Sequence, residues 1–366
     1  MAQLSEGFWS GQRVLVTGHT GFKGSWLVLM LDLLGSDVSG FSLPAVTAPS
    51  LFADAGVGEI CHDYRGDIRD EAAIRGVLDA AQPQIIFHLA AQAIVARGYA
   101  APLETLSSNV MGTATVLEAV RSYGQATAVI VVTTDKVYRD TGGADAYRES
   151  DPLGGNDPYG ASKACAELVT ECYRERYLRP IGTRVASVRA GNVIGGGDWG
   201  QARLIPDIVR AWALGEQVVV RNPGHVRPWQ YVLEVLTGYL LLAEKLSQGQ
   251  APEGAYNFGP RDGEAIAVAS VVARAVDLLA FEKVELEPAH AGGLEVSQLR
   301  IDSTKVRNVL GFKNLLSVEE AIGETLRWYR IADQQGDQLA LSRQSIKDYW
   351  DRLSSSTRQE GHDDCY

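Results

Sequence analysis

The sequence predicts an α/β fold in which a doubly wound parallel sheet is joined to a smaller, mostly C-terminal α/β lobe. Short runs of β-branched residues alternate with helical segments, which is typical of a parallel sheet covered by helices on both faces. The first run, residues 13–17, leads into a glycine-rich turn and a helix over residues 25–34. The length of 366 residues suits one large unit or two domains.

Composition narrows the class of protein. A net charge of −11 argues against a general nucleic-acid binder, which would show a basic face. No apolar stretch reaches the ~18 residues that a membrane span needs, and residues 1–11 lack the features of a secretory signal. The absence of a Cys-x-x-Cys pair predicts reduced thiols, no metal site and a cytoplasmic protein. The cysteines are Cys61, Cys165, Cys172 and Cys365.

The glycine-rich turn has the spacing G-x-x-G-x-x-G between a strand and a helix. Its residues are Gly18, His19, Thr20, Gly21, Phe22, Lys23 and Gly24. Gly18 allows a tight turn, Gly21 lets the backbone approach a pyrophosphate, and Gly24 lets the helix pack close to the strand. The N-terminus of the helix would then face the phosphates. A plain strand–helix turn is the alternative interpretation.

This spacing resembles the extended, nucleotide-sugar branch of the short-chain dehydrogenase/reductase superfamily, and the resemblance covers about residues 10–335. It implies a Rossmann-type NAD-binding domain at residues 10–191 that carries the catalytic residues. Residues 192–335 would form mainly a substrate-binding lobe, although the chain can cross back to the sheet. Residues 336–366 would be a C-terminal extension, with a short helix over residues 341–353 and a polar, disordered end.

Other segments of the predicted sheet add cofactor contacts. The second strand, residues 37–43, ends in neither an acid nor an arginine, so this position does not separate NAD from NADP. The resemblance implies that Asp67 and Ile68 meet the adenine, although Asp67 could instead be a turn residue or a helix cap. The strand at residues 84–92 contains His88, interpreted as a core residue. That strand ends in small residues that let a cofactor approach, within the run Leu89, Ala90 and Ala91.

Reactive side chains follow the central strand at residues 128–132, where an open α/β sheet binds its ligands. They are Thr134, Asp135 and Lys136. Tyr159 and Lys163 stand four residues apart on a helix that runs to about residue 177, so they share one helix face. A nearby ammonium lowers the pKa of a phenol from ~10, which would make Tyr159 a base.

The acid/base pair after Thr134 resembles nucleotide-sugar 4,6-dehydratases. Together with the segments at residues 189–199 and 221–230, it resembles the CDP-glucose branch of that group. The resemblance implies that Tyr159 takes the proton of the sugar 4-hydroxyl, with help from Thr134 and Lys163. Lys136 would then remove the carbon 5 proton while Asp135 protonates the leaving 6-hydroxyl. A salt bridge to Asp135 or a phosphate contact is the alternative for Lys136.

The expected substrate is CDP-glucose or a related nucleotide sugar. Arg227 and Asn192 are the expected pyrophosphate partners, since arginine offers a rigid fork of donors. Arg203 and Leu204 could line the nucleotide-base pocket or simply begin a helix. The resemblance also implies a homodimer or homotetramer that associates through helices at residues 103–123 and 160–177.

Three other functions stay open. An NAD-dependent nucleotide-sugar 4-epimerase would keep the Thr–Tyr–Lys set but would not need the acid/base pair. A 4,6-dehydratase could use a different nucleotide sugar. A non-catalytic nucleotide-binding regulator on the same fold is the third, and the intact Thr–Tyr–Lys set argues against it.

Overall fold

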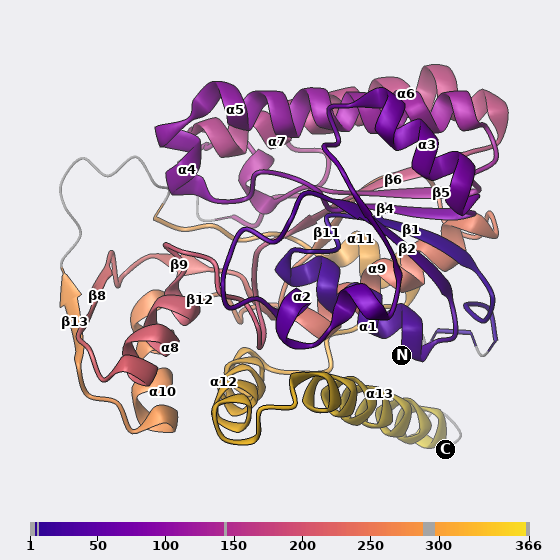
Figure 1. The fold of residues 1–366 in the computed structure, drawn as a ribbon. Coiled ribbons are helices and arrows are strands. Elements are labelled where there is room, and N and C mark those ends of the chain that lie inside the picture. The colour runs from indigo at the N-terminus through magenta and orange to yellow at the C-terminus, as the bar shows by residue number, and fades with distance from the viewer. Residues whose placement is uncertain (1–3, 6, 143–144, 288–296, 364–366) are drawn as a thin grey trace.

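A twisted parallel sheet forms the centre of the molecule (Figure 1). The computed structural model describes residues 4–5, 7–142, 145–287 and 297–363. Within these residues the sheet has seven strands, in the spatial order β11 (Gly254–Phe258), β6 (Arg184–Ala190), β5 (Ala128–Val132), β4 (Ile85–His88), β1 (Arg13–Thr17), β2 (Asp37–Ser42) and β3 (His62–Arg65). The strand order reverses beside β1, which pairs with both β2 and β4.

The alternation of side chains along each strand gives the sheet a separate core on each face. In β5, Ala128, Ile130 and Val132 enter one hydrophobic cluster, whereas Val129 and Val131 enter the other. Successive side chains of a strand point to opposite faces, so a strand buried on both sides is apolar throughout. This is why the β-branched run at residues 128–132 marked a central strand in the sequence.

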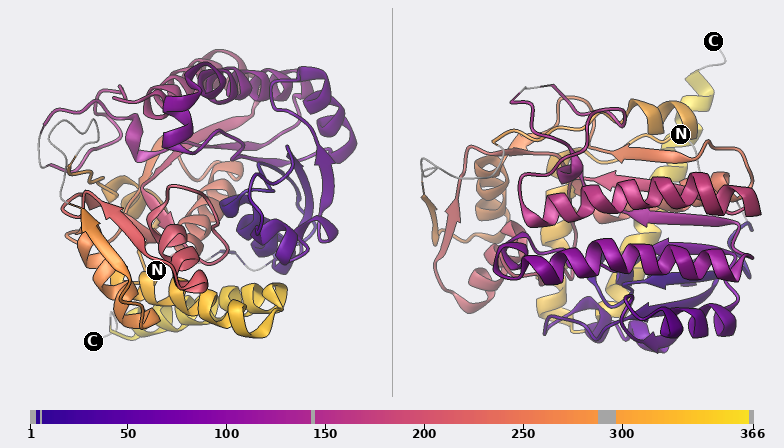
Figure 2. Two further views of the ribbon diagram at one scale, coloured as in Figure 1. Left: turned by 60° about the vertical axis from the view of Figure 1, so that its left-hand side comes forward. Right: turned by 90° about the horizontal axis from the view of Figure 1, so that it is seen from above.

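Helices cover both faces of the sheet (Figure 1). One layer contains α3 (Glu71–Ala81), α4 (Val95–Ala100), α5 (Pro102–Leu106), the π-helical turn Ser107–Met111, α6 (Gly112–Tyr123) and α7 (Pro158–Tyr173). The other contains α1 (Phe22–Leu33), α2 (Leu51–Asp54), α9 (Val232–Ser247), α12 (Val318–Gln335) and α13 (Gln338–Asp363). Helices α6 and α7 lie side by side on the outside of their layer (Figure 2, right).

The smaller lobe lies beyond the carboxyl ends of the strands (Figure 1). Its elements are β7 (Asn192–Ile194), α8 (Leu204–Leu214), β8 (Val218–Arg221), β9 (Val226–Arg227), β10 (Trp229–Tyr231), β12 (Ile266–Ala267), α10 (Val268–Leu279) and β13 (Val284–Glu287). The strands pair as β7 with β10, β8 with β13 and β9 with β12. The chain crosses back to the main sheet after β10, where α9 packs on β5 and β6 and β11 pairs with β6. Helix α11 (Thr304–Leu310) then packs on β11.

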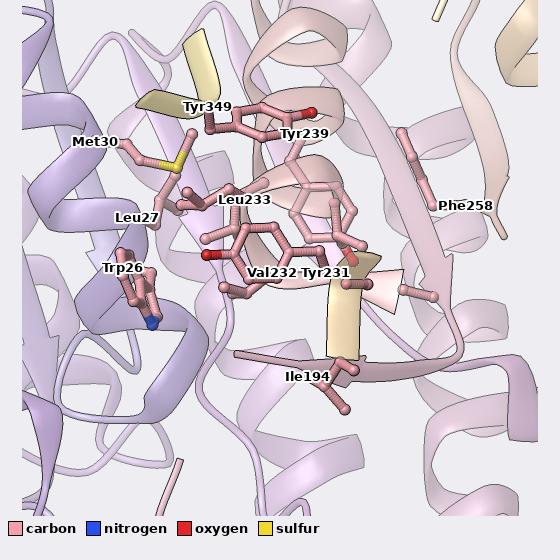
Figure 3. Close-up of a cluster of buried hydrophobic side chains, with 14 of the residues drawn as sticks. Trp26, Leu27, Met30, Ile194, Tyr231, Val232, Leu233, Tyr239, Phe258 and Tyr349 are labelled. Carbon is pink, nitrogen blue, oxygen red and sulfur yellow. The ribbon is translucent and has the colours of Figure 1, made fainter. Parts of the chain in front are cut away.

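Helix α9 is buried nearly all round, as expected for a helix that is apolar on every side. Figure 3 shows its side chains Val232 and Leu233 near Trp26 of α1 and Tyr349 of α13, with Tyr239 on the side of Phe258 of β11. The helix therefore joins the main sheet, the first Rossmann helix and the C-terminal helices in one core.

The C-terminal extension differs from the expectation of a short helix followed by a disordered end. Helix α13 continues past Leu353 to Asp363. Ser342, Ile346, Tyr349 and Leu353 lie on one helical face and are buried. Once such a face is packed on the core, each further residue adds a helical hydrogen bond at low cost. The polar residues up to Asp363 therefore continue the helix.

Two further observations concern the cysteines and the ability of the helices to span a membrane. Cys61, Cys165 and Cys172 are free thiols, and Cys365 lies outside the described residues. Among the described residues, every helix is too short or too polar to cross a lipid bilayer.

Candidate active site

The glycine-rich turn after β1 has the geometry that its sequence predicted. Gly18 has φ +78°, and a Cβ there would lie 2.6 Å from the backbone nitrogen of Ala90. A Cβ on Gly24 would lie 2.1 Å from the Gly18 carbonyl oxygen, so only glycine allows this close packing. Gly21 is the N-cap of α1 and gives no side-chain acceptor to its first turn. The amides of that turn can therefore face an anionic ligand.

One cavity brings together eleven of the predicted cofactor residues. They are Gly18, Thr20, Gly21, Phe22, Lys23, Gly24, Asp67, Ile68, Leu89, Ala90 and Ala91. The same cavity is lined by the end of β2, the loop that follows it and the start of α2, and the sequence did not predict this loop as part of the site. The lining residues there are Ser42, Leu43, Pro44, Val46, Thr47, Ser50 and Leu51. The position of this loop, directly after a strand of an open α/β sheet, was the signal that could have found it.

Of the two alternatives left for Asp67, a turn residue or a helix cap, the structure shows the turn, because its carboxylate accepts from the Arg69 amide at 2.9 Å. Asp70 caps α3, since its carboxylate accepts from the Ala73 amide at 3.1 Å. Asp67 instead pairs with Arg69 at 2.5 Å, and this hydrogen bond lowers the pKa of Asp67. An ionised carboxylate is thus available on the cavity wall. At the end of β2, the hydroxyls of Thr20 and Ser42 lie 2.9 Å apart where many NAD-binding folds have an acid.

Thr134, Asp135 and Tyr159 meet beyond the end of β5. Thr134 begins a 3-10 turn over Asp135–Val137, and its hydroxyl donates to the Asp135 carboxylate at 3.0 Å. The same hydroxyl hydrogen-bonds the Tyr159 phenol. Tyr159 is in the first turn of α7, which begins there because Asp157 accepts from the amides of Tyr159 and Gly160 and Pro158 occupies the first turn.

The interaction expected between Lys163 and Tyr159 takes a different form. The Lys163 ammonium donates to the Val132 carbonyl at 2.9 Å. Burial raises the pKa of Tyr159 to about 12, and the hydrogen bond with Thr134 acts in the opposite direction. The expected lowering is therefore absent in this arrangement. Burial, with the charge of Lys23, lowers the pKa of Lys163 to about 7, so its own charge is sensitive to pH near neutrality.

Asp135 has the properties of a proton donor. Its side chain is buried, and among the described residues its Oδ2 atom has no hydrogen-bond partner. Burial raises the pKa of this carboxyl, although the charges of Lys136 and Arg227 oppose the shift. A carboxyl shifted in this direction keeps its proton at a higher pH than an exposed one.

The four predicted substrate residues are at the junction with the smaller lobe. Arg227 is buried, donates to the Val226 carbonyl at 3.0 Å, and is close enough to influence the pKa of Asp135. Asn192 begins β7, which pairs with the strand that follows Arg227. Leu204 is the first residue of α8.

Arg203 lines the cofactor cavity. It pairs with Asp198 at 2.8 Å, and its charge lowers the pKa of Tyr159. Arg203 is therefore close enough to Tyr159 to influence its pKa, and it also stands at the N-cap of α8.

His88 is a core residue, as its place in an apolar strand predicted. Its two ring nitrogens lie 2.8 Å from the hydroxyl of Thr17 and 3.1 Å from that of Thr113. Burial, together with the charge of Lys163, lowers its pKa to about 3. The ring is therefore neutral at physiological pH and joins two neighbouring elements to β4.

Comparisons with known proteins agree with this geometry. The chain is 42% identical to the CDP-glucose 4,6-dehydratase of Salmonella typhimurium over 97% of this chain and 100% of that protein. It is 28% identical to the dTDP-glucose 4,6-dehydratase of Xanthomonas campestris, over 86% of this chain and 92% of that one. It is also similar to the structure of the Streptomyces venezuelae dTDP-glucose 4,6-dehydratase with bound NAD. That likeness has a TM-score of 0.74 and 26% identity, and covers 90% of this chain and 100% of the other.

The family model described as GDP-mannose 4,6 dehydratase matches residues 15–325. This range spans the glycine-rich turn, the 3-10 turn after β5, the start of α7 and most of the smaller lobe. The chain belongs to the GDP-mannose 4,6 dehydratase family.

Proposed function

We propose that the protein is an NAD-dependent hydro-lyase that converts CDP-glucose to CDP-4-dehydro-6-deoxy-glucose and water. The observation that carries the proposal is the buried, protonatable Asp135 carboxyl beside Thr134 and Tyr159. A dehydratase needs an acid for the departing hydroxyl in addition to the oxidation machinery. The 42% identity to a CDP-glucose 4,6-dehydratase supports the choice of substrate.

The first step needs a base at the sugar 4-hydroxyl. Tyr159 takes this proton while the hydroxyl of Thr134 holds the oxygen in place. Because burial raises the pKa of Tyr159 in the protein alone, positive charge must be brought near the phenol before it can act. Arg203 already contributes in that direction, and Lys163 can turn from Val132 toward the phenol.

The second step removes water across carbons 5 and 6. The ketone at carbon 4 acidifies the carbon 5 proton, and Lys136 removes it. Asp135 donates its proton to the 6-hydroxyl, which leaves as water. The raised pKa of Asp135 supports this role because the carboxyl has to arrive at the step protonated. Lys136 has to act in its neutral form.

NAD is the cofactor, and when bound it would supply the acceptor for the carbon 4 hydride and the source of the hydride that carbon 6 needs. The glycine-rich turn would hold its pyrophosphate, and Asp67 and Ile68 its adenosine. Leu89, Ala90 and Ala91 would line the cofactor site with small and apolar side chains. Lys163 would contact the nicotinamide ribose.

The substrate nucleotide would lie against the smaller lobe. Arg227 and Asn192 would hold its pyrophosphate, with Arg203 and Leu204 beside the base. Arg227 suits this role because its guanidinium is already fixed by backbone carbonyls and faces Asp135, so a bound sugar would extend toward the acid.

The experiment is incubation of the purified protein with CDP-glucose, UDP-glucose and dTDP-glucose in parallel. A 4-keto-6-deoxy product that absorbs in base should form from CDP-glucose at the highest kcat/KM. A product that retains all its water and differs only at carbon 4 would favour the 4-epimerase. Tight nucleotide binding with no turnover of any sugar would favour the non-catalytic regulator.

We also propose that the enzyme is a cytoplasmic homodimer or homotetramer. Exposed apolar side chains lie on α5, on the π-helical turn Ser107–Met111 and on α7, including Leu103, Met111 and Leu168. Apolar side chains grouped on two adjacent helices are typical of a protein–protein contact. The free thiols of Cys61, Cys165 and Cys172 support a reducing compartment.

A further inference from the structure

A buried carboxylate lies directly behind the catalytic cluster. Glu167 of α7 accepts hydrogen bonds from the Arg189 guanidinium at 3.0 and 2.9 Å, one to each carboxylate oxygen. It also accepts from the hydroxyls of Thr133 at 2.5 Å and Ser187 at 2.7 Å. These four bonds fill the acceptor capacity of a carboxylate. Burial alone would raise its pKa, but the bonds and the charge of Arg189 lower it, so Glu167 is ionised.

The partners of Glu167 connect it to each catalytic element. Lys163 precedes it by one turn of α7, and Tyr159 by two, so the three side chains share a helix face. Thr133 is the residue before Thr134, at the point where β5 becomes the catalytic turn. The carboxylate therefore joins the helix that carries Tyr159 and Lys163 to the turn that carries Thr134 and Asp135.

Arg189 extends the connection to the far side of the site. It donates to the Tyr138 phenol at 3.0 Å and to the Glu149 carbonyl at 3.2 Å. Tyr138 in turn donates to Asn257 of β11 at 2.6 Å. The chain that follows the catalytic turn is thus held against β6 and β11 by the same charged pair.

We propose that Glu167 is a positioning residue, whose carboxylate fixes α7 against the end of β5 and sets how Thr134, Tyr159 and Lys163 face one another. The proposal rests on the proposed dehydratase function, because it concerns the geometry of that reaction. Misplacement of reacting groups by about 1 Å can cost a factor of about 100 in rate. A carboxylate whose acceptor positions are all hydrogen-bonded, at the junction of the two catalytic elements, is suited to prevent such misplacement.

The position of Glu167 also affects the charge of Lys163. Among the described residues, the ionisable groups near Lys163 are Lys23 from α1, His88 from β4, and Tyr159 and Glu167 from its own helix. His88 is neutral, Lys23 disfavours the charged form of Lys163, and Glu167 favours it. Replacement of Glu167 by a neutral residue should therefore lower the titration midpoint of Lys163, by about 1 pH unit.

The test compares the wild type with Glu167→Gln and Thr133→Val, and with Glu171→Gln as the matched control on the exposed side of the same helix. A double variant, Glu167→Gln with Arg189→Met, avoids leaving Arg189 as an unpaired buried charge. Lys163 is titrated through its ¹³Cε resonance in lysine-labelled protein, assigned with Lys163→Met, and kcat with CDP-glucose is measured across pH.

The Glu167→Gln and double variants should lose about 10- to 100-fold in kcat. Both the Lys163 midpoint and the alkaline limb of kcat should move to lower pH. Thr133→Val keeps the charge, so it should lower kcat without moving the midpoint, and Glu171→Gln should change neither.

An unchanged Lys163 midpoint in a folded Glu167→Gln or double variant, or wild-type kcat in Thr133→Val, would overturn the proposal. A merely structural role would lower thermal stability and leave the midpoint in place. The NMR titration needs no turnover. Failure of the wild type to convert CDP-glucose would therefore count against the proposed function and not against this arrangement.

Discussion

Burial moves the two central ionisable side chains toward their neutral forms. The pKa of the Asp135 carboxyl is raised and that of the Lys163 ammonium is lowered. Groups shifted in this way exchange protons more readily near neutral pH than exposed ones. Burial of these ionisable groups destabilises the folded state. The hydrogen bonds from Lys163 to Val132 and from Thr134 to Asp135 offset part of this destabilisation.

Replacement of the Tyr159 hydroxyl should stop the first oxidation. Tyr159→Phe should fold normally, since the buried ring is kept, yet turn over CDP-glucose at least ~10²–10⁴-fold more slowly because a general base is lost. Steady-state assays of the 4-keto product and a melting curve test both parts. Near-normal turnover in a folded Tyr159→Phe variant would remove Tyr159 from the mechanism.

Asp135 and Lys136 should matter only after the first step. Asp135→Asn and Lys136→Met should still reduce bound NAD⁺ when CDP-glucose is added, because oxidation needs only Thr134, Tyr159 and Lys163. They should release little dehydrated product. Single-turnover absorbance of the reduced cofactor, together with deuterium uptake at carbon 5, separates the steps.

Lys136→Met should slow exchange of the carbon 5 proton more than Asp135→Asn does. If either variant dehydrates at the wild-type rate, its residue has only a structural role. If neither reduces NAD⁺, the pair serves the first step or the fold, and the dehydratase assignment loses its main support.

Residue spacing predicted that Tyr159 and Lys163 share one face of a helix, but not the electrostatics around them. The four-residue interval between Tyr159 and Lys163 was enough to place both on one helix face. It could not tell that the ammonium donates to a strand carbonyl, because that depends on where β5 ends relative to α7. The Glu167–Arg189 pair was also missed, since it joins a helix to a strand. Its only local signals were a charge one turn after Lys163 and an arginine inside a β-branched run.

At the scale of elements, sequence periodicity gave most helices and strands close to their final limits. The expected ranges for β1 and β5 agree with the structure residue for residue. A capping box opens α12, in which Ser317 is the N-cap and Glu320 is its partner. Helix α13 was underestimated because its polar end has no apolar pattern of its own and depends on an anchor formed earlier in the helix.

Glu234, near the start of the buried helix α9, should make stability depend on pH. Burial raises its pKa to about 7, and hydrogen bonds from Leu316 and Asn314 only partly oppose this. The folded state then holds a proton that the unfolded state releases above its ordinary pKa of about 4.3. The contribution of Glu234 to the stability of the folded state is therefore fully present below pH ~4.3 and is lost as the pH rises to about 7.

Glu234→Gln keeps the shape and the acceptor for Leu316 but cannot ionise. Its Tm should fall less than that of the wild type between about pH 5 and pH 8. Glu319→Gln, at an exposed position, is the control and should follow the wild type. Parallel wild-type and Glu234→Gln curves across this range would show that Glu234 does not ionise differently on folding.

At the scale of the whole molecule, the outer helix layer should determine assembly. Leu103→Glu and Leu168→Glu place charges on the apolar surface of α5 and α7, where burial in a subunit contact would be costly. Both should shift the protein toward the monomer in size-exclusion chromatography with light scattering. Leu214→Glu, on the exposed surface of α8, is the matched control. A monomeric wild type would contradict the proposed association.

The position of β11 has a consequence for synthesis of the chain on the ribosome. Strand β6 is finished at Ala190, but its outer neighbour β11 and the helix α9 that covers β5 and β6 are translated later. At ~5–20 residues per second, several seconds pass in which β6 is an open edge beside an uncovered apolar face. A nascent chain at this stage exposes surface of the kind that chaperones recognise. We therefore expect dependence on chaperones during expression to be greatest before β11 emerges.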